Sequence, residues 1–220
     1  MSRLAFAGYG VFGALVIGLL AFITLRPIQV LPRIAPAPGF VVLDQDEQPL
    51  TSEDLRGAIT LYNFSYSGCR PPCPDTTAVM QAVAQKLPTL DTKGVPVRLV
   101  TLSVDPARDT AEVLRAFGAR YGADFTQWRF ATAEAGRLKH LIGGGFGIYY
   151  QVRPDGTLVL DPAFMLVDGN GLLRAEYRTA NPNLDIILRD IRLVAMEAVQ
   201  SAGPGRLAYE AAHLFVCYPR

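Results

Sequence analysis

The sequence predicts an α/β domain with a mainly parallel sheet, preceded by an N-terminal transmembrane helix. Strand-like and helix-like segments alternate after residue 40, and residues 97–104 (VRLVTLSV) form a nearly continuous apolar run. Such alternation builds parallel sheets, and an apolar run of this length suits a central strand buried on both faces. Residues 4–25 contain no charged residue and are long enough to span a bilayer, which predicts the helix.

The N-terminal segment predicts a single-pass membrane protein. It is longer than the apolar region of a cleaved signal peptide, so we expect residues 1–25 to remain as a transmembrane anchor in the lipid bilayer. Arg3 precedes the apolar run and Arg26 follows it, so flanking charge discriminates only weakly between orientations. A short tail before the anchor and a long chain after it favour a domain on the outer, periplasm-like side of the cell membrane.

Residues 26–39 are rich in proline and show no helical pattern, which predicts a stiff, extended linker between the anchor and the domain. The domain, residues 40–200, opens with a strand-like stretch at 40–43. A turn and a short helix-like stretch at 52–55 follow. Residues 58–66 (AITLYNFSY) are rich in β-branched and aromatic side chains and predict a strand.

The rest of the domain continues the alternation, with helices predicted from apolar residues at helical spacing and strands from short apolar runs. In chain order we expect a helix at 76–87, a strand at 97–104, a helix after Asp109 or Thr110, a strand at 128–131, a helix at 134–142 ended by three glycines, hairpins within 146–160 and 163–177, and a helix at 184–199. This order is a thioredoxin-like layout. After a Gly/Pro break, residues 201–220 predict an apolar C-terminal tail helix.

Composition excludes one class of partner. The chain has 21 Lys and Arg residues against 20 Asp and Glu residues, which gives a net charge of +1. No basic stripe with interleaved aromatic residues appears, so nucleic acid is not expected as a partner. The sequence also lacks a phosphate-binding loop with a lysine, and its two histidines do not suggest a Ser/His/Asp grouping.

Two cysteines, Cys69 and Cys73, lie in FSYSGCRPPCPD, between a predicted strand and a predicted helix. A helix N-terminus favours a thiolate, which serves both thiol–disulfide exchange and binding of a soft metal such as Cu(I). The spacing allows a disulfide, or lets both sulfurs face one copper ion that requires a third ligand. A local structural disulfide is the third alternative, although so small a ring contributes little stability. The residues alone leave all three alternatives open.

Three separated stretches resemble the Sco/SenC family: FSYSGCRPPCPDT, LVTLSVDPARDTAEVLRAF and GFVVLDQDEQPLTSEDLRG. The resemblance covers about residues 39–199. It implies a membrane-anchored thioredoxin-like domain that delivers copper to the binuclear copper site of cytochrome c oxidase, or reduces the cysteines of that site. The family holds copper with its two motif cysteines and a distant histidine, so Cys69 and Cys73 would be the sulfur ligands.

The expected histidine is where this chain departs from the family pattern. The matching position, in LDPAFMLVDGNG, is Pro162, and proline has no side-chain donor atom. His140 lies about twenty residues earlier in a predicted helix, where a partly exposed structural histidine is the simpler interpretation. We therefore expect an incomplete copper site and no certain cofactor, with Cu(I) as the candidate.

Two further pairs of residues are candidates for chemistry. His213 and Cys217 are four residues apart on one face of the tail helix, which is usable ligand spacing. Their apolar neighbours favour a tail helix packed on the domain, the bilayer or a partner. Asp105 and Asp109 follow the predicted central strand and are expected near the cysteine loop, because neighbouring parallel strands end on the same side of a sheet. A carboxylate there could accept a proton, or could cap a turn and a helix.

Three functions remain as hypotheses. The first is a copper chaperone for an oxidase, which needs the missing ligand. The second is a thiol-disulfide oxidoreductase that reduces cysteines of a respiratory complex, which needs only Cys69, Cys73 and a reductant. The third is an accessory subunit of a membrane electron-transfer complex, either cytochrome oxidase or another quinol or cytochrome complex. The sequence favours a Sco-like accessory subunit or assembly factor that acts on, or is built into, a respiratory complex.

Overall fold

The structure is a computed structural model of the chain. It describes residues 9–10, 12–14, 16–18, 20–21, 24, 28–71, 73–153, 157–203 and 205–215. The described residues before 25 are helical, and the rest of the predicted anchor lies outside the described residues. Within the described part of the chain, no helix is both long enough and apolar enough to cross a membrane. The anchor therefore stays a prediction.

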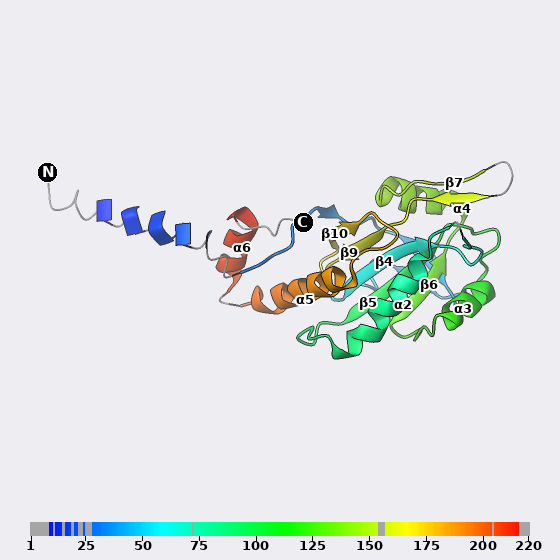
Figure 1. The fold of residues 1–220 in the computed structure, drawn as a ribbon, viewed down its shortest axis with the longest axis horizontal. Helices are drawn as coiled ribbons and strands as arrows, with labels where there is room; N and C mark the ends of the chain where they lie inside the picture. The colour runs from blue at the N-terminus through cyan, green and yellow to red at the C-terminus, as the bar shows by residue number, and fades with distance from the viewer. Residues whose placement is uncertain are drawn as a thin grey trace.

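One eight-stranded sheet forms the centre of the domain (Figure 1). Its strands, in spatial order, are β1 (Ala35–Pro36), β10 (Leu172–Tyr177), β9 (Phe164–Val167), β4 (Ile59–Ser65), β5 (Val97–Ser103), β6 (Trp128–Thr132), β2 (Val41–Asp44) and β3 (Pro49–Thr51). Within the described residues, the β4–β5 and β5–β6 pairs of this sheet are parallel and its other five pairs are antiparallel, so the prediction of a mainly parallel sheet is wrong. The predicted hairpin within 146–160 exists as β7 (Tyr150–Val152) and β8 (Leu158–Leu160), but it forms a separate two-stranded sheet.

Helices cover both faces of the sheet. They are α2 (Thr76–Lys86), the 3-10 turn η1 (Leu87–Thr89), α3 (Ala111–Arg120), α4 (Ala135–Leu138), the π-helical η2 (Lys139–Gly145), α5 (Leu184–Gln200) and α6 (Arg206–Phe215). Helices α2, α3 and α5 bury apolar side chains against one face, and α2 and α5 lie side by side in Figure 1. The opposite face packs against α4, η2 and the β7–β8 hairpin. Apolar side chains from both faces of β4 and β5 are buried, as predicted for central strands.

Two local predictions are wrong. Residues 52–55 form turns rather than a helix, because Thr51 and Asp54 hydrogen-bond to each other's backbone and side chains and close a single turn. The three glycines at 143–145 do not end the helix at 142, since it continues through them as a π-helix. A Cβ atom on Gly145 would lie 2.6 Å from the Cβ atom of Pro38, so this close approach requires glycine.

Residues 28–39, expected to be a linker, pack along the domain. Val30 and Leu31 are fully buried. The Ile34 amide donates to the Leu173 carbonyl at 2.9 Å, and strand β1 then pairs with β10. This stretch therefore contributes to the fold at the edge of the sheet.

Candidate functional site

The cysteine loop contains a disulfide between Cys69 and Cys73, whose Cα atoms are 5.5 Å apart. Both side chains are half-buried and pack against the apolar cluster beneath α4 and the hairpin. The loop begins directly after β4, which is the place the sequence predicts. A bonded pair that remains partly open to solvent can be reached by a thiol from another molecule.

Two tight turns shape the loop. The Cys69 amide donates to the Tyr66 carbonyl at 3.0 Å, and the Cys73 amide donates to the Arg70 carbonyl at 2.8 Å. The Pro74 carbonyl oxygen lies 3.4 Å from the Cys69 Sγ atom and 4.0 Å from that of Cys73. These local turns bring the two sulfurs together.

Helix α2 begins at Thr76, the residue at which the sequence predicts it. Its N-cap is Asp75, whose carboxylate accepts from the Ala78 amide at 3.0 Å, and its first residue is Thr76. The Cys69 Sγ atom lies 3.4 Å from the carbonyl oxygen of Pro74, the residue before this N-cap. The Tyr121 hydroxyl donates to Asp75 at 2.9 Å. Burial, followed by this carboxylate, raises the pKa of Tyr121 to about 12. The start of α2 therefore follows the cysteine pair closely, as the sequence predicts.

Asp109 connects the cysteine loop to the end of β5. Its fully buried carboxylate accepts from the Ser67 amide at 3.1 Å, from the Ser67 hydroxyl, and from the Ser103 hydroxyl at 2.5 Å. The Arg120 guanidinium donates to the Ser67 carbonyl at 3.2 Å. The predicted position of Asp109 near the cysteine loop is thus correct. Thr110, rather than Asp109, caps helix α3.

Asp105 lies in the same region and is only 8% exposed. Burial raises its pKa, and the nearby Arg108 guanidinium, at 3.5 Å, opposes that shift. Burial also raises the pKa of Tyr66, with the charge of Asp105 adding to the effect. A carboxyl group whose pKa is raised can exchange a proton closer to neutral pH than an ordinary aspartate.

The donors for a metal ion near this loop are few. The β4–β9 register pairs Asn63 with Phe164, the first residue of β9, and Pro162 lies two residues before it in the chain. The proline ring at this position carries no donor atom. Among the residues that the structure describes, no three His, Cys, Asp or Glu side chains gather as a metal site. Two reduced cysteines alone make an incomplete donor set for Cu(I).

His140 is exposed in η2, where it lines a cavity of about 600 Å³ together with Pro38 and Arg137. His213 lies elsewhere, on α6, with its Nε2 atom 2.8 Å from the Glu197 Oε1 atom. Cys217 lies outside the described residues. His213 thus contacts a carboxylate of α5, and the suggested His213–Cys217 ligand pair stays untested.

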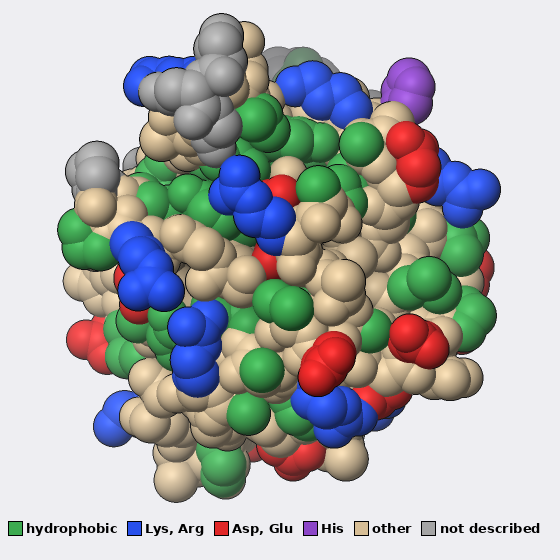
Figure 2. Space-filling view, turned by 90° about the vertical axis from the view of Figure 1, so that its right-hand side faces the viewer, with side chains coloured by type: hydrophobic (Ala, Val, Ile, Leu, Met, Phe, Trp, Pro, Cys, Tyr) green, Lys and Arg blue, Asp and Glu red, His purple; other side chains and the backbone are tan. Residues whose placement is uncertain are grey.

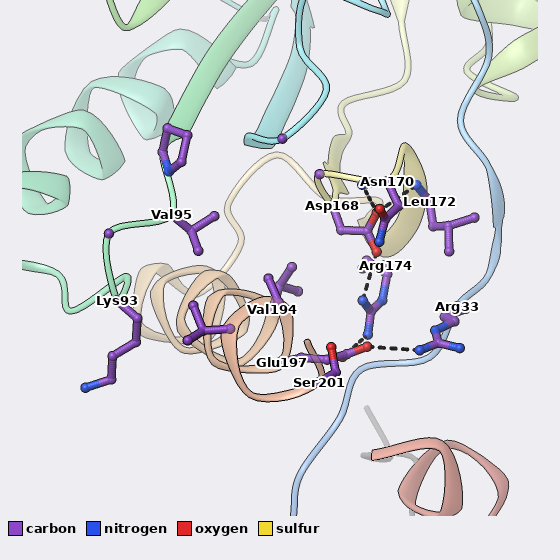
Figure 3. Close-up of a pocket in the computed structure, with 16 residues that line it drawn as sticks. Arg33, Lys93, Val95, Asp168, Asn170, Leu172, Arg174, Val194, Glu197 and Ser201 are labelled. Atoms are coloured by element: carbon purple, nitrogen blue, oxygen red, sulfur yellow. Dashed lines mark hydrogen bonds and ion pairs between the residues drawn. The ribbon is translucent and has the colours of Figure 1, made fainter. Parts of the chain in front are cut away.

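A buried ionic cluster at the opposite end of the sheet was missed by sequence reasoning. The Arg174 guanidinium, 2% exposed, pairs with Asp168 at 2.9 Å and with Glu197 at 2.5 Å (Figure 3). It also donates to the Leu31 carbonyl at 2.8 Å and to the Pro32 carbonyl at 3.1 Å. The cluster therefore joins β10, α5 and the segment before β1.

The Glu197 carboxylate lies in contact with both Arg174 and His213. Burial alone would raise the pKa of Glu197, but the hydrogen bonds and charges of His213 and Arg174 lower it to about 2. Arg33 lies 3.4 Å from the same carboxylate, beside a cavity of about 710 Å³ that Lys93 and Val95 also line (Figure 3). Arg33 and Arg174 are already paired with carboxylates. We therefore interpret the cluster as a clamp, meaning a set of ion pairs that holds separate segments of the chain together, rather than as a ligand site.

The disulfide end of the molecule is polar. Figure 2 looks onto the end of the domain farthest from the described N-terminal residues, and it shows prominent Lys and Arg side chains on the left half. Arg70, in the loop, and Arg108, 63% exposed, belong to this end. The cysteine loop thus lies at a solvated surface.

Comparison with known proteins identifies the family. The family model described as SCO1/SenC matches residues 33–195. The chain belongs to the SCO1/SenC family. A SCO1 protein homolog of Bacillus subtilis is 27% identical over 157 residues, which cover 70% of this chain and 79% of that protein. The Sco resemblance seen in the sequence is therefore confirmed.

Solved Sco structures share the fold. A SCO1/SenC family lipoprotein from Bacillus anthracis has a TM-score of 0.66 at 27% identity, covering 73% of this chain and 95% of that one. BsSco, in which a disulfide switch was identified, has a TM-score of 0.65 at 26% identity, covering 75% of this chain and 96% of that one. BsSco is a member of the Sco family of cytochrome c oxidase assembly proteins. These likenesses confirm the mixed α/β, thioredoxin-like fold.

Proposed function

We propose that this Sco protein is a membrane-anchored assembly factor that exchanges thiols and disulfides with a cysteine pair of a respiratory complex. It would do so without a complete copper site of its own. The observation that carries the proposal is the disulfide between Cys69 and Cys73 on a half-buried loop. BsSco, a relative at 26% identity, combines a disulfide switch with a place among cytochrome c oxidase assembly proteins.

The proposed reaction conserves atoms and electrons. In the reduced protein, a thiolate of one loop cysteine attacks a disulfide of the partner, and a mixed disulfide forms as one partner sulfur leaves as a thiolate. The second loop cysteine then attacks the mixed disulfide. The partner gains two electrons and two protons as a dithiol, and the Cys69–Cys73 bond re-forms. An external dithiol must reduce the loop before the next cycle.

Neighbouring groups suit this exchange. Asp109 holds Ser67, two residues before Cys69, so the loop stays attached to the sheet while its sulfurs change partners. Asp105 has a raised pKa, which suits a group that exchanges protons with thiols through water. Copper carriage is less well supported, because Pro162, at the position where the family resemblance leads us to expect the histidine, has no side-chain donor atom.

Membrane anchoring is part of the proposal. Its support is the uncharged run at residues 4–25, and the relative from Bacillus anthracis is a lipoprotein. Purification in mild detergent separates an assembly factor from an accessory subunit. An assembly factor should wash away from the mature complex, whereas retention in fixed stoichiometry would favour the subunit.

Exchange with a model dithiol tests the chemistry. The oxidised full chain, in detergent, is mixed with a reduced Cys-x3-Cys peptide, and alkylated products are followed by mass spectrometry. We expect peptide disulfide to form as the Cys69–Cys73 pair becomes reduced. Against the disulfide-bonded form of the same peptide, one single variant, Cys69→Ser or Cys73→Ser, should trap a mixed disulfide, and Cys217→Ser should leave the wild-type rate unchanged. Failure of the wild-type chain to exchange would overturn the proposal.

A further inference from the structure

Helix α6 presents two leucines on its outer side. Leu207 is 83% exposed and Leu214 is 78% exposed, the largest fractions among the exposed large hydrophobic residues that the structure describes. They are seven residues apart, so they lie on the same side of the helix, about 10 Å from each other along its axis. Solvent is an unfavourable environment for a pair of large apolar side chains so fully exposed.

The inner side of α6 is fixed to the domain. Tyr209 and Ala212 are buried against Val30. His213 contacts Glu197, whose carboxylate belongs to the ionic cluster around Arg174. Since the contacts on this side involve both packing and charge, the helix cannot roll to bury its leucines without breaking them.

A second ion pair joins α6 to the N-terminal segment. Glu210 accepts from Arg33 at 3.0 Å and 3.1 Å, through two guanidinium nitrogens. Figure 1 shows α6 beside the chain that leads from the described N-terminal helical residues into the domain. The outer side of α6 is therefore held close to the start of the folded domain.

This position lies within reach of a membrane. From residue 25, where the uncharged run ends, to Val30, the chain can span at most about 17 Å. Val30 contacts α6 directly. We propose that α6 is an interfacial helix whose Leu207 and Leu214 insert into the lipid surface beside the anchor. Exposed Arg206 at the start of the helix would face lipid phosphates. The inference rests on the membrane anchoring of the proposed function.

Depth-dependent quenching tests this contact. The full-length Leu207→Trp variant is reconstituted in phosphatidylcholine vesicles with or without brominated acyl chains, which quench tryptophan at the lipid surface. The single native tryptophan, Trp128, is 1% exposed in the domain core and gives a constant background. Tyr149→Trp is the matched control, because Tyr149 is 52% exposed next to β7, far from α6 in Figure 1. We expect at least twofold stronger quenching at position 207, and similar quenching for Leu214→Trp.

The outcomes separate the inference from the anchor on which it rests. Vesicle flotation reports the anchor, because a chain that stays in solution has none, and that result overturns both. A chain that floats while position 207 is quenched no more than position 149 overturns the interfacial helix alone. Protection of position 207 from aqueous iodide without quenching by brominated lipid would indicate a second copy or another protein on this face, and would also overturn it.

Discussion

The two ends of this domain are held together by different chemistry. At the disulfide end, turns and hydroxyl groups around one buried carboxylate, Asp109, support a half-buried loop. At the opposite end, Arg174, Glu197 and Asp168 form a charged cluster that is almost fully buried. Both ends are polar, but only the second depends on paired ions removed from water.

This difference suggests that the cysteine loop serves reactivity, whereas the ionic cluster holds segments of the chain together. A loop that changes its redox state must remain accessible, and short local turns let its sulfurs part without unfolding the sheet. The ionic cluster instead ties the segment before β1 and helix α6 to β10 and α5. We therefore expect substitutions in the cluster to change stability and substitutions in the loop to change chemistry.

The largest expected effect is the loss of Arg174. Arg174→Leu leaves Asp168 and Glu197 buried without their shared cation, and we expect it to reduce the free energy of unfolding by roughly 3–5 kcal/mol. Chemical denaturation followed by circular dichroism measures this change. Arg206→Leu is the matched control, since Arg206 is exposed, and it should change stability by less than about 0.5 kcal/mol. Equal changes in the free energy of unfolding for the two variants would contradict a stabilising role of the ionic cluster.

Acid should weaken the same end. The pKa of Glu197 falls from 4.5 to about 2 on folding, because His213 and Arg174 outweigh the effect of burial. A carboxyl group whose pKa is lower in the folded state stabilises the fold when it is ionised, above pH 4.5. We expect the free energy of unfolding to fall by roughly 2–3 kcal/mol as the pH falls from 4.5 toward 2 and this contribution is lost. Unfolding measured between pH 6 and pH 2 should show a smaller pH dependence in Glu197→Gln. An unchanged slope would exclude Glu197 as the titrating group.

Loss of the disulfide should separate stability from chemistry. Replacing both loop cysteines by serine opens a very small ring, so chain entropy predicts a loss of only about 2 kcal/mol. Thiol–disulfide exchange with a dithiol peptide should disappear completely. A double variant that unfolds at room temperature would instead show that the bond is mainly structural.

The smallest expected effect on stability is at Asp109. Asp109→Asn keeps the shape but weakens the bonds to Ser67 and Ser103, so we expect a cost of about 1–2 kcal/mol. The loop is then less firmly held, and the rate of exchange should change. Glu112→Gln, at an exposed position of α3, is the control. Stopped-flow measurement of exchange would contradict this role if both variants matched the wild-type chain.

Local patterns in the sequence predicted most of the fold. Continuous apolar runs marked β4 and β5, and helical spacing marked α2 and α5, because burial on one or both faces leaves a periodic signal. Strand β3 was missed, and the turns at 52–55 were misassigned as a helix. Segments of three or four residues are too short to show a helical or strand-like repeat of apolar side chains. The three glycines after Ile142 were misread as a helix end, and the packing of Gly145 against Pro38 is a tertiary contact that local sequence does not reveal.

The site was predictable only in part. Cys69 and Cys73 are visible as a motif, and the end of a parallel strand places Asp109 near them. The cluster of Arg174, Glu197 and Asp168 joins the hairpin predicted at residues 163–177 to helix α5, and no spacing in the sequence reveals that contact. An arginine within the otherwise mostly apolar run LLRAEY was the one local hint.

We infer that the cysteine loop works through its thiols and lacks a complete copper site. Titration of the reduced full chain with Cu(I), in competition with a chelator, tests it most directly when wild type and Pro162→His are compared. We predict weak binding by the wild-type chain and at least a tenfold tighter site in Pro162→His, abolished in both by Cys69→Ala. A wild-type chain that binds one Cu(I) as tightly as Pro162→His would contradict the account.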